Sequence, residues 1–414
     1  MQIKNQLINP KIFYFLLAFC LLSLPFPDYS LNTKGMIGLT IYWLFFFNSW
    51  KEKLNLLRKH FFFFLVISSF FWMSLVGMLY TNDISGALNE LQKKAPFILF
   101  PLILFSTPHS QNSPRFFLMN SYTMGICAAS LLALTKIWYF KWNNLGEYFT
   151  YAKFSEFLNR HTTYYALLIV VSLLWILWAY INKKNNRYVL VVVGLVFGYI
   201  LYLLSVRASI IALTGGIVII LNSLKINKWK KIVGLLFIPI LMVMIYFTPN
   251  FQNRFELSAT DSASISDIEY RKLHWTSVLE TIQNQSILFG KGTHGSREFL
   301  YEKYRDYGLS AAYKLQYNAH NQFLETLLDF GVFGLLVFMG SMVYCTYFFI
   351  KHKDFYALGT LTVFIIFMIN ESIFQRTIGV VLFSLLISFF IKENVKKQHV
   401  KKLPEDQNYL SQLK

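Results

Sequence analysis

The chain has 414 residues, of which 55% are hydrophobic and only 14% are charged. A soluble domain carries about 25% charged residues, so this composition excludes a protein that is surrounded by water on all sides. The net charge of +18 could indicate a nucleic-acid-binding protein. Whether it does depends on where the basic residues lie.

Long apolar stretches recur along the whole chain, and no soluble-looking block separates them. A helix of roughly 20 residues crosses about 30 Å of hydrocarbon, and a backbone in lipid must satisfy its own hydrogen bonds, which a helix does. The sequence therefore predicts an all-α, polytopic membrane helical bundle that forms a single domain, 1–414. We expect about 12 transmembrane helices, at residues 12–27, 35–50, 61–80, 95–107, 116–137, 163–182, 188–205, 208–224, 232–248, 328–350, 355–372 and 377–391.

The basic residues gather on one side of this arrangement. If the N-terminus is cytoplasmic and the sides alternate, the cytoplasmic segments hold 22 Lys and Arg against 5 Asp and Glu, and the rest of the chain holds 17 against 16. An excess of Lys and Arg is typical of cytoplasmic loops. The charge therefore orients a multi-pass membrane protein with both termini cytoplasmic, and we expect no nucleic-acid partner. Residues 392–414 are expected to form a charged, loosely ordered cytoplasmic tail.

Residues 249–320 form a large predicted loop on the exported side, between the ninth and tenth spans. This loop lacks a continuous hydrophobic core, so we expect helices that lie over the membrane domain, with Gly290-Lys291-Gly292 as a turn. Its second half is rich in tyrosines, some of them spaced to share one helix face. Such a face could stack on sugar rings or lie at the lipid headgroups as an aromatic belt; these residues are Tyr301, Tyr304, Tyr307, Tyr313 and Tyr317.

Three arginines fall on the same exported face and are candidates for substrate binding. Arg207 lies at the tight junction between the seventh and eighth spans, Arg271 in the large loop, and Arg160 just before the sixth span. A guanidinium group suits a phosphate because its planar fork donates two charged hydrogen bonds. Taken singly, each could instead be an interfacial or solvated charge.

His320 opens the stretch that leads into the tenth span. A neutral imidazole at a membrane surface can take a proton from an attacking hydroxyl near neutral pH. A lone histidine at such a position is ordinarily a hydrogen-bonded residue at a helix start. Glu325 and Asp329 follow, four residues apart, and share a helix face on which they could pair with an arginine or face water.

The residues after His320 follow a specific spacing. His320 and Asn321 are followed by nine residues, then Gly331, two residues and Gly334. This pattern resembles the signature of the O-antigen ligases, within the O-antigen ligase and polymerase superfamily of bacterial envelope enzymes. The resemblance changes the interpretation of His320 from a lone histidine to a candidate catalytic residue.

Three upstream elements resemble the same superfamily, in the same order. Arg160–Tyr164 looks like the element before its sixth or so span, and Ser205–Arg207 approximates its Ser-Arg element with Val206 inserted. Arg271 with Trp275, and then Gly290-Lys291-Gly292, looks like its Arg…Trp…Gly-x-Gly run. These motifs cover roughly 155–340, and the expected topology extends the resemblance to the entire chain.

The resemblance implies a membrane glycosyltransferase of the GT-C type. Such enzymes take a glycan from a polyprenyl diphosphate donor and move it, on the periplasmic face of the bacterial inner membrane, to an acceptor, which for ligases is the lipid A–core. The implied reaction needs no metal and no other cofactor. The exported loops show no acidic pair with metal-ligand spacing, so arginines are expected to neutralise the diphosphate.

The hypothesis for the site follows from these matches. His320 is the general base on the acceptor hydroxyl, and Arg207 and Arg271 hold the diphosphate, with Arg160 as a third. Asn321, Gly331 and Gly334 support the base. The reaction is expected to invert the anomeric centre, and the lipid tail of the donor to enter sideways between the spans.

Alternative functions stay open at this point. A polymerase of the same superfamily would join two carrier-linked repeats, and a protein O-oligosaccharyltransferase would use a protein hydroxyl as acceptor. Outside this class, a polysaccharide transporter would be expected to show broken helices or paired charges near the bilayer midplane, often in two related halves. The sequence shows no such repeat.

Overall fold

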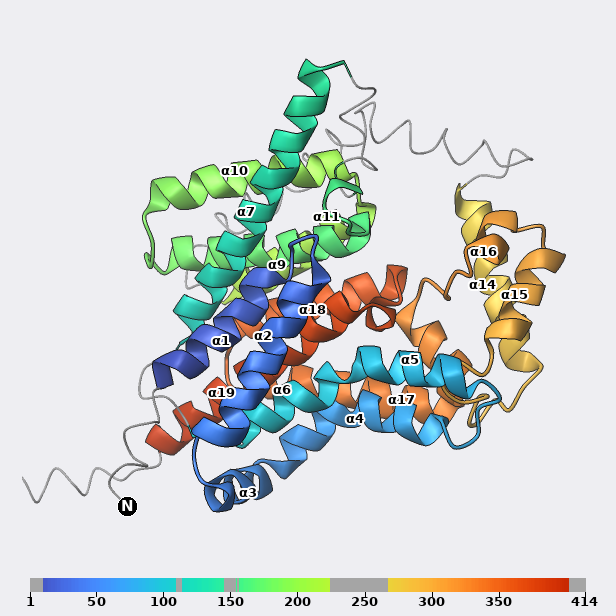
Figure 1. Ribbon diagram of the computed structural model, residues 1–414, viewed down its shortest axis with the longest axis horizontal. Coiled ribbons are helices and arrows are strands. Elements are labelled where there is room, and N and C mark those ends of the chain that lie inside the picture. Colours follow the sequence, from blue (N-terminus) through green and yellow to red (C-terminus); the bar gives the residue numbers. More distant parts are fainter. Residues whose placement is uncertain (1–9, 109–113, 145–153, 155, 224–266, 402–414) are drawn as a thin grey trace, which may run out of the picture.

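The computed structural model describes residues 10–108, 114–144, 154, 156–223 and 267–401, which are helical and contain no strand within these ranges (Figure 1). The predicted all-helical fold is confirmed. The helices are α1 (Pro10–Ser23), α2 (Tyr29–Ile41), α3 (Trp50–Lys59), α4 (Phe61–Gly77), α5 (Ile84–Lys94), α6 (Pro96–Phe105), α7 (Arg115–Trp142), α9 (Thr162–Ile181), α10 (Arg187–Leu204), α11 (Arg207–Asn222), α14 (Asp267–Gln283), α15 (Arg297–Asp306), α16 (Ser310–Lys314), α17 (Gln322–Lys351), α18 (Phe355–Asn370) and α19 (Thr377–Lys401). A π-helical turn, Tyr42–Phe46, ends α2, and the 3-10 turn η4, Ile373–Gln375, joins α18 to α19.

Five of the described helices are long and apolar enough to cross a membrane: α7, α9, α10, α17 and α19. The pair α3 and α4, bent by 85°, makes a sixth if it counts as one span. Helices α1, α11 and α18 are apolar but shorter. The chain is thus a helical membrane protein, whereas the prediction of about twelve spans is not confirmed; the expected span 232–248 lies outside the described residues.

The end of the chain forms the centre of the bundle. The apolar stretch of α19 is buried along its whole length, and it packs against α6, α4 and α18. A helix that is apolar all round belongs inside a bundle, which is where α19 lies. On its outer side α18 packs against α11 and α17. Helices α14, α15 and α16 gather at the end of α17 where that helix begins (Figure 1).

Helix α19 continues beyond the apolar stretch, where the sequence predicted a loosely ordered tail. Glu393 is buried and accepts a hydrogen bond from Arg115, the first residue of α7. The same guanidinium group binds Asp354, the N-cap of α18, at 2.9 Å. Lys392 donates to the carbonyl oxygen of Thr107 at 3.0 Å. These buried charges extend the helix because they find partners on the neighbouring elements.

Helix α17 is interrupted at Gly331, which lies between the candidate base and the apolar part of the helix. Gly331 has φ 63° and ψ −165°, a conformation that is essentially restricted to glycine. The loop before α15 replaces the lost helical bonds: Val332 donates to the carbonyl of Ile287 at 2.9 Å, and Gly292 donates to that of Asp329 at 2.9 Å. The break therefore binds the predicted turn at Gly290-Lys291-Gly292 directly to α17.

The glycines of that turn are required by close backbone contact. Gly290 and Gly292 both have positive φ angles, as expected for a turn. A methyl group on Gly290 would lie 2.5 Å from the carbonyl oxygen of Asp329, and one on Gly292 would lie 2.2 Å from that of Gly77. A methyl group on Gly334 would meet the Cβ of Phe330 at 2.2 Å. The spaced glycines of the two motifs thus form a single packing arrangement.

We predict that Gly331→Ala destabilises the fold by at least about 1–3 kcal/mol, because alanine is strained at this backbone conformation and its methyl group would meet backbone atoms of Leu288 and Phe289. Thermal unfolding in detergent measures the effect. Gly340→Ala is the matched control on the same helix, since a methyl group there meets nothing within 4 Å. Equal melting temperatures for the two variants would contradict this account of the break.

Candidate active site

His320 lies directly before the first turn of α17. Its backbone is left-handed, with φ 45°, and its side chain is 35% exposed. The next residue, Asn321, is extended and caps the helix: its Oδ1 accepts hydrogen bonds from the backbone of Phe323 at 2.9 Å and of Leu324 at 3.1 Å. An asparagine at this position satisfies helix donors that would otherwise lack partners. The predicted supporting residue Asn321 therefore fixes the place at which His320 leaves the helix.

Glu371 is the partner of the imidazole ring. Its Oε1 lies 3.0 Å from Nδ1 of His320, and its side chain is buried just after the end of α18. Burial acts to raise the pKa of Glu371, but the hydrogen bond and the positive charge that His320 can carry outweigh it and lower the pKa. A carboxylate at Nδ1 favours the tautomer with the proton on Nδ1, which leaves the lone pair on Nε2. The pair is thus suited to general-base chemistry at Nε2.

The start of α17 and the connection after α18 are joined by further hydrogen bonds. Asn321 donates through Nδ2 to the carbonyl of Ile369 at 3.0 Å and through its backbone to Oγ of Ser372 at 3.2 Å. Gln322 accepts from the backbone of Phe374 at 2.8 Å. Tyr164 of α9 donates to the carbonyl of Ser372 at 3.0 Å. Glu371 therefore lies in a connection that is fixed by hydrogen bonds to α17 and α9 and by the end of α18, and this fixes its position beside His320.

Aromatic side chains surround the other faces of His320. The ring of Tyr317 meets it edge-on at 5.3 Å between centroids, and the ring of His274 lies 5.3 Å away. His274 in turn stacks on the buried Tyr304 at 4.6 Å. Burial, with the nearby His320 and Arg271, lowers the pKa of His274 to about 3, so this second imidazole is neutral at ordinary pH.

The predicted tyrosine face is only partly what the sequence suggested. Tyr304 is fully buried, and the hydroxyl of Tyr307 donates to Glu280 of α14. Both residues link α15 to its surroundings, and the buried Tyr304 ring cannot stack on a sugar without moving. Tyr317, beside His320, is the residue of the predicted set that touches the candidate base.

Two of the three predicted arginines lie at the end of α18 that adjoins Glu371. Arg271 of α14 donates to Oδ1 of Asn370, the last residue of α18, at 3.4 Å. Arg207 is the first residue of α11, after a left-handed turn at Ser205. Because α11 packs antiparallel to α18, with Ile220 beside Gly359 and Gly215 beside Ile366, its N-terminal end lies at the C-terminal end of α18.

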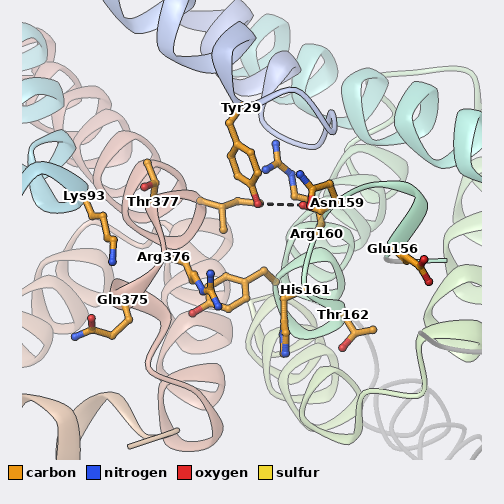
Figure 2. Close-up of a pocket in the computed structure, with 12 residues that line it drawn as sticks. Tyr29, Lys93, Glu156, Asn159, Arg160, His161, Thr162, Gln375, Arg376 and Thr377 are labelled. Atoms are coloured by element: carbon orange, nitrogen blue, oxygen red, sulfur yellow. Dashed lines mark hydrogen bonds between the residues drawn. The ribbon is translucent and has the colours of Figure 1, made fainter. Parts of the chain in front are cut away.

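The third arginine, Arg160, lies in a separate pocket (Figure 2). It precedes α9, and its guanidinium group stacks on the ring of Tyr29 at 3.5 Å and donates to the carbonyl of Leu24 at 3.1 Å. The pocket also includes Gln375 and Arg376, which follow Glu371 closely in the chain. The structure thus places Arg271 at the end of α18, Arg207 on the end of α11 that packs beside it, and Arg160 in a pocket that the far end of the connection helps to form.

A buried ion group supports the site from behind. Arg297, the first residue of α15, binds Glu325 of α17 and lies 3.7 Å from Asp329. The second oxygen of Glu325 accepts from the backbone of Ala319 at 2.8 Å and from Oγ of Ser372 at 3.3 Å. Of the two roles left open for Glu325 and Asp329, pairing with an arginine is therefore the one observed. Glu325 therefore links Ala319, which precedes His320, to Ser372, which follows Glu371.

Several residues of this arrangement were missed by reasoning from the sequence. Glu371 had one usable signal, since an acidic residue at the edge of an apolar span is a functional candidate by default. His274 and Arg297 gave none, because their importance comes from helices packed together far apart in sequence. Within the described ranges, no group of three or more His, Cys, Asp or Glu side chains is arranged to hold a metal ion.

Comparison with known proteins bears on this region. Residues 192–339 match the family model described as O-antigen ligase, and the matched segment contains Arg207, Arg271 and His320. No curated protein matched the chain. The resemblance to the O-antigen ligase superfamily is therefore confirmed over this segment, and Arg160 and Glu371 lie outside it.

We predict that Arg297→Met destabilises the protein by about 3–5 kcal/mol, because it leaves the carboxylates of Glu325 and Asp329 buried without their cation. Unfolding in detergent measures the loss, and in the double variant with Glu325→Gln it should be smaller than the sum of the single losses. Arg305→Met on the same helix is the control: its side chain is 58% exposed, so its loss should stay within about 0.5 kcal/mol. An additive double variant would disprove the coupling.

We also predict an acid-sensitive contribution from His274. The unfolded chain takes up a proton on this residue as the pH falls through its ordinary pKa of 6.5, whereas the folded protein resists protonation until about pH 3. Stability is therefore lost as the pH falls below 6.5, by about 2 kcal/mol at about pH 5. Melting curves above pH 6.5 and at about pH 5 should show a smaller loss of stability in His274→Gln than in the wild type. Identical losses would refute the prediction.

Proposed function

We propose that this chain, whose residues 192–339 match the family model described as O-antigen ligase, is a membrane glycosyltransferase that moves a glycan from a polyprenyl diphosphate carrier to the lipid A–core. The observation that carries this proposal is the pair of His320 and Glu371, beside Arg271, at the start of α17. It combines a base, a group that orients the base and a cation for a leaving diphosphate. These are the three elements that an inverting, metal-independent transfer requires.

In the proposed reaction, Nε2 of His320 takes the proton of an acceptor hydroxyl. The oxygen of that hydroxyl attacks the anomeric carbon of the donor sugar while the bond from this carbon to the diphosphate oxygen breaks, with inversion. Glu371 stabilises the imidazolium that forms, because its carboxylate is already bound to Nδ1. The proton then leaves His320 to water or to the released diphosphate, which restores the base.

Arg207 and Arg271 are proposed to hold the diphosphate. Charge develops on the leaving diphosphate oxygens, and guanidinium groups placed there in advance stabilise it without reorganisation. The position of both at the end of α18 near Glu371 supports this assignment. Arg160 lies in the neighbouring pocket, so its assignment to the same diphosphate stays a prediction.

The proposed setting follows from the family and the charge distribution. The enzyme lies in the bacterial inner membrane with both termini cytoplasmic and His320 on the periplasmic face, in a helical fold of the GT-C type. The carrier lipid reaches the site sideways between helices, so membrane lipids are the immediate surroundings of the donor. No cofactor is part of the proposed reaction.

Two related functions share the same chemistry. An O-antigen polymerase would use a second carrier-linked repeat as acceptor, and a protein O-oligosaccharyltransferase would use a protein hydroxyl. A strain that lacks the protein distinguishes them: loss of a ligase leaves bare lipid A–core with long chains on the carrier, loss of a polymerase leaves core with one repeat, and loss of the third leaves proteins unglycosylated. A polysaccharide transporter would show no turnover when purified.

We predict that His320→Ala lowers the rate of transfer by about 10²- to 10⁴-fold, the usual contribution of a general base, while the protein stays folded in the membrane. Arg271→Ala and Arg207→Ala should each cost about 10²- to 10³-fold, as the loss of one stabilising donor does. The assay uses purified protein, carrier-linked glycan and lipid A–core. His352→Gln, at the opposite end of α17, is the control and should keep full activity. Normal transfer by His320→Ala would rule out the assigned base.

A further inference from the structure

The pocket around Arg160 has a volume of about 650 Å³, which is within the range of small-molecule sites. We call it the Arg160 pocket. Its walls come from the start of α2, the end of α5, the segment before α9 and the connection from η4 into α19, represented by Tyr29, Lys93, His161 and Gln375 (Figure 2). Neither His320 nor Arg271 nor Arg207 lines it. It therefore lies next to the candidate catalytic pair without including His320.

Two buried side chains in this pocket present hydrogen-bond donors that the described part of the chain does not satisfy. Arg160 is only 5% exposed, and its Nη2 is bound to the carbonyls of Leu24 and Phe26, but its Nε and Nη1 meet no acceptor there. Gln375 is 6% exposed, and its Nε2 likewise lacks an acceptor among the described residues. Buried donors without partners cost about 1–3 kcal/mol each, more when charged. Both residues line the cavity, but these donor atoms are themselves covered, so a ligand there reaches them only after the guanidinium or amide group turns toward it.

The remaining polar groups of the pocket specify the charge of that ligand. Arg376 is exposed and projects from the connection into the pocket region, and Lys93, on the same side of the pocket as Gln375, is bound to Glu90 at 2.7 Å (Figure 2). One carboxylate, Glu156, is part of the lining. Lys93 is already paired with Glu90, so Arg160 and Arg376 face the single carboxylate of Glu156, and this cationic lining fits a phosphate group better than a neutral sugar.

We propose that the Arg160 pocket binds a phosphate group of the acceptor glycolipid. This rests on the proposed transferase function, and it deepens that function by separating the two substrates. A transferase holds donor and acceptor at the same time, one on each side of the bond that is exchanged. Arg207 and Arg271 serve the donor diphosphate at the end of α18, and the Arg160 pocket, at the far end of the connection that carries Glu371, serves the acceptor.

The connection after α18 explains how the donor and the acceptor can both lie near His320. Glu371 binds His320, Tyr164 donates to the carbonyl of Ser372, and the next residues, Gln375 and Arg376, line the pocket. An acceptor held by its phosphate at Arg160 is thus anchored on the same short segment that orients the imidazole. The distance between anchor and base then selects which hydroxyl of the acceptor is presented to Nε2.

The test measures the binding of each substrate separately, with full-length protein in lipid nanodiscs and native mass spectrometry. The probes are lipid A–core with its phosphates intact, the same glycolipid after phosphatase treatment, and polyprenyl diphosphate. Arg376→Gln is the main variant because its exposed side chain can be replaced without disturbing a buried group. Arg160→Gln is the second variant. Arg305→Gln, exposed on α15, is the matched control.

We expect Arg376→Gln and Arg160→Gln to weaken binding of the phosphorylated glycolipid about tenfold, the effect of losing one charged hydrogen bond, with polyprenyl diphosphate unaffected. Arg271→Gln should show the reverse, and the dephosphorylated glycolipid should bind wild type and pocket variants equally weakly. Loss of diphosphate binding in the pocket variants would assign the pocket to the donor and overturn the proposal, as would no change in either substrate.

A second measurement tests the phosphate site even if the proposed transferase function is wrong. If the wild type binds neither lipid, the pocket is examined by thermal stabilisation with glucosamine phosphate, which needs no turnover. A stabilisation that Arg376→Gln removes and Arg305→Gln keeps would retain the phosphate site while the transferase proposal fails. No stabilisation in the wild type would eliminate both.

Discussion

The attachment of the start of α17 to the connection after α18 is the constraint on which the candidate site depends. His320 and Glu371 are 51 residues apart, and neither lies in a regular helix. They meet because Asn321 and Gln322 bind the connection directly, and because Glu325 links Ala319 to Ser372. Each of these bonds is made within the first turn of α17, where backbone donors lack helical partners and side chains can act as caps.

The same end of α17 also explains why the glycines of the two motifs occur together. Gly331 breaks the helix two turns after its start, and the loop around Gly290 and Gly292 fills the break with backbone hydrogen bonds. That loop leads into α15, whose first residue, Arg297, neutralises Glu325. The break, the loop and the ion pair therefore fix the short first segment of α17 from three directions. The apolar remainder of the helix packs against α4 and α18, on the other side of the break from His320.

The sequence predicted the structure where a local pattern decides the outcome, such as a run of apolar residues or the spacing of a motif. Apolar stretches predicted helices at each expected span within the described residues, and the spacing from His320 to Gly334 predicted the family that residues 192–339 match. It was insufficient where the answer depends on contacts between distant elements. Glu371 was assigned to the end of a span, and nothing local indicated that α17 would bring an imidazole to it. Lys392 and Glu393 were assigned to a tail because they are charged, whereas partners on Thr107 and Arg115 allow α19 to continue through them.

The arginines show how the structure refines a prediction based on composition. Taken from the sequence, Arg160, Arg207 and Arg271 formed one set, since each lies at the same predicted face and each can bind phosphate. Packing divides them: two lie at the end of α18, and one lies in a pocket that also contains Lys93 and Arg376. An enzyme that joins two membrane-bound substrates gains from such a division, because a single cationic cluster would bind either anion and hold the wrong one as readily as the right one. In the proposed reaction, two anion sites connected by the segment that carries Glu371 would let charge position both substrates, and the distance from the acceptor site to the imidazole would select the hydroxyl that reacts.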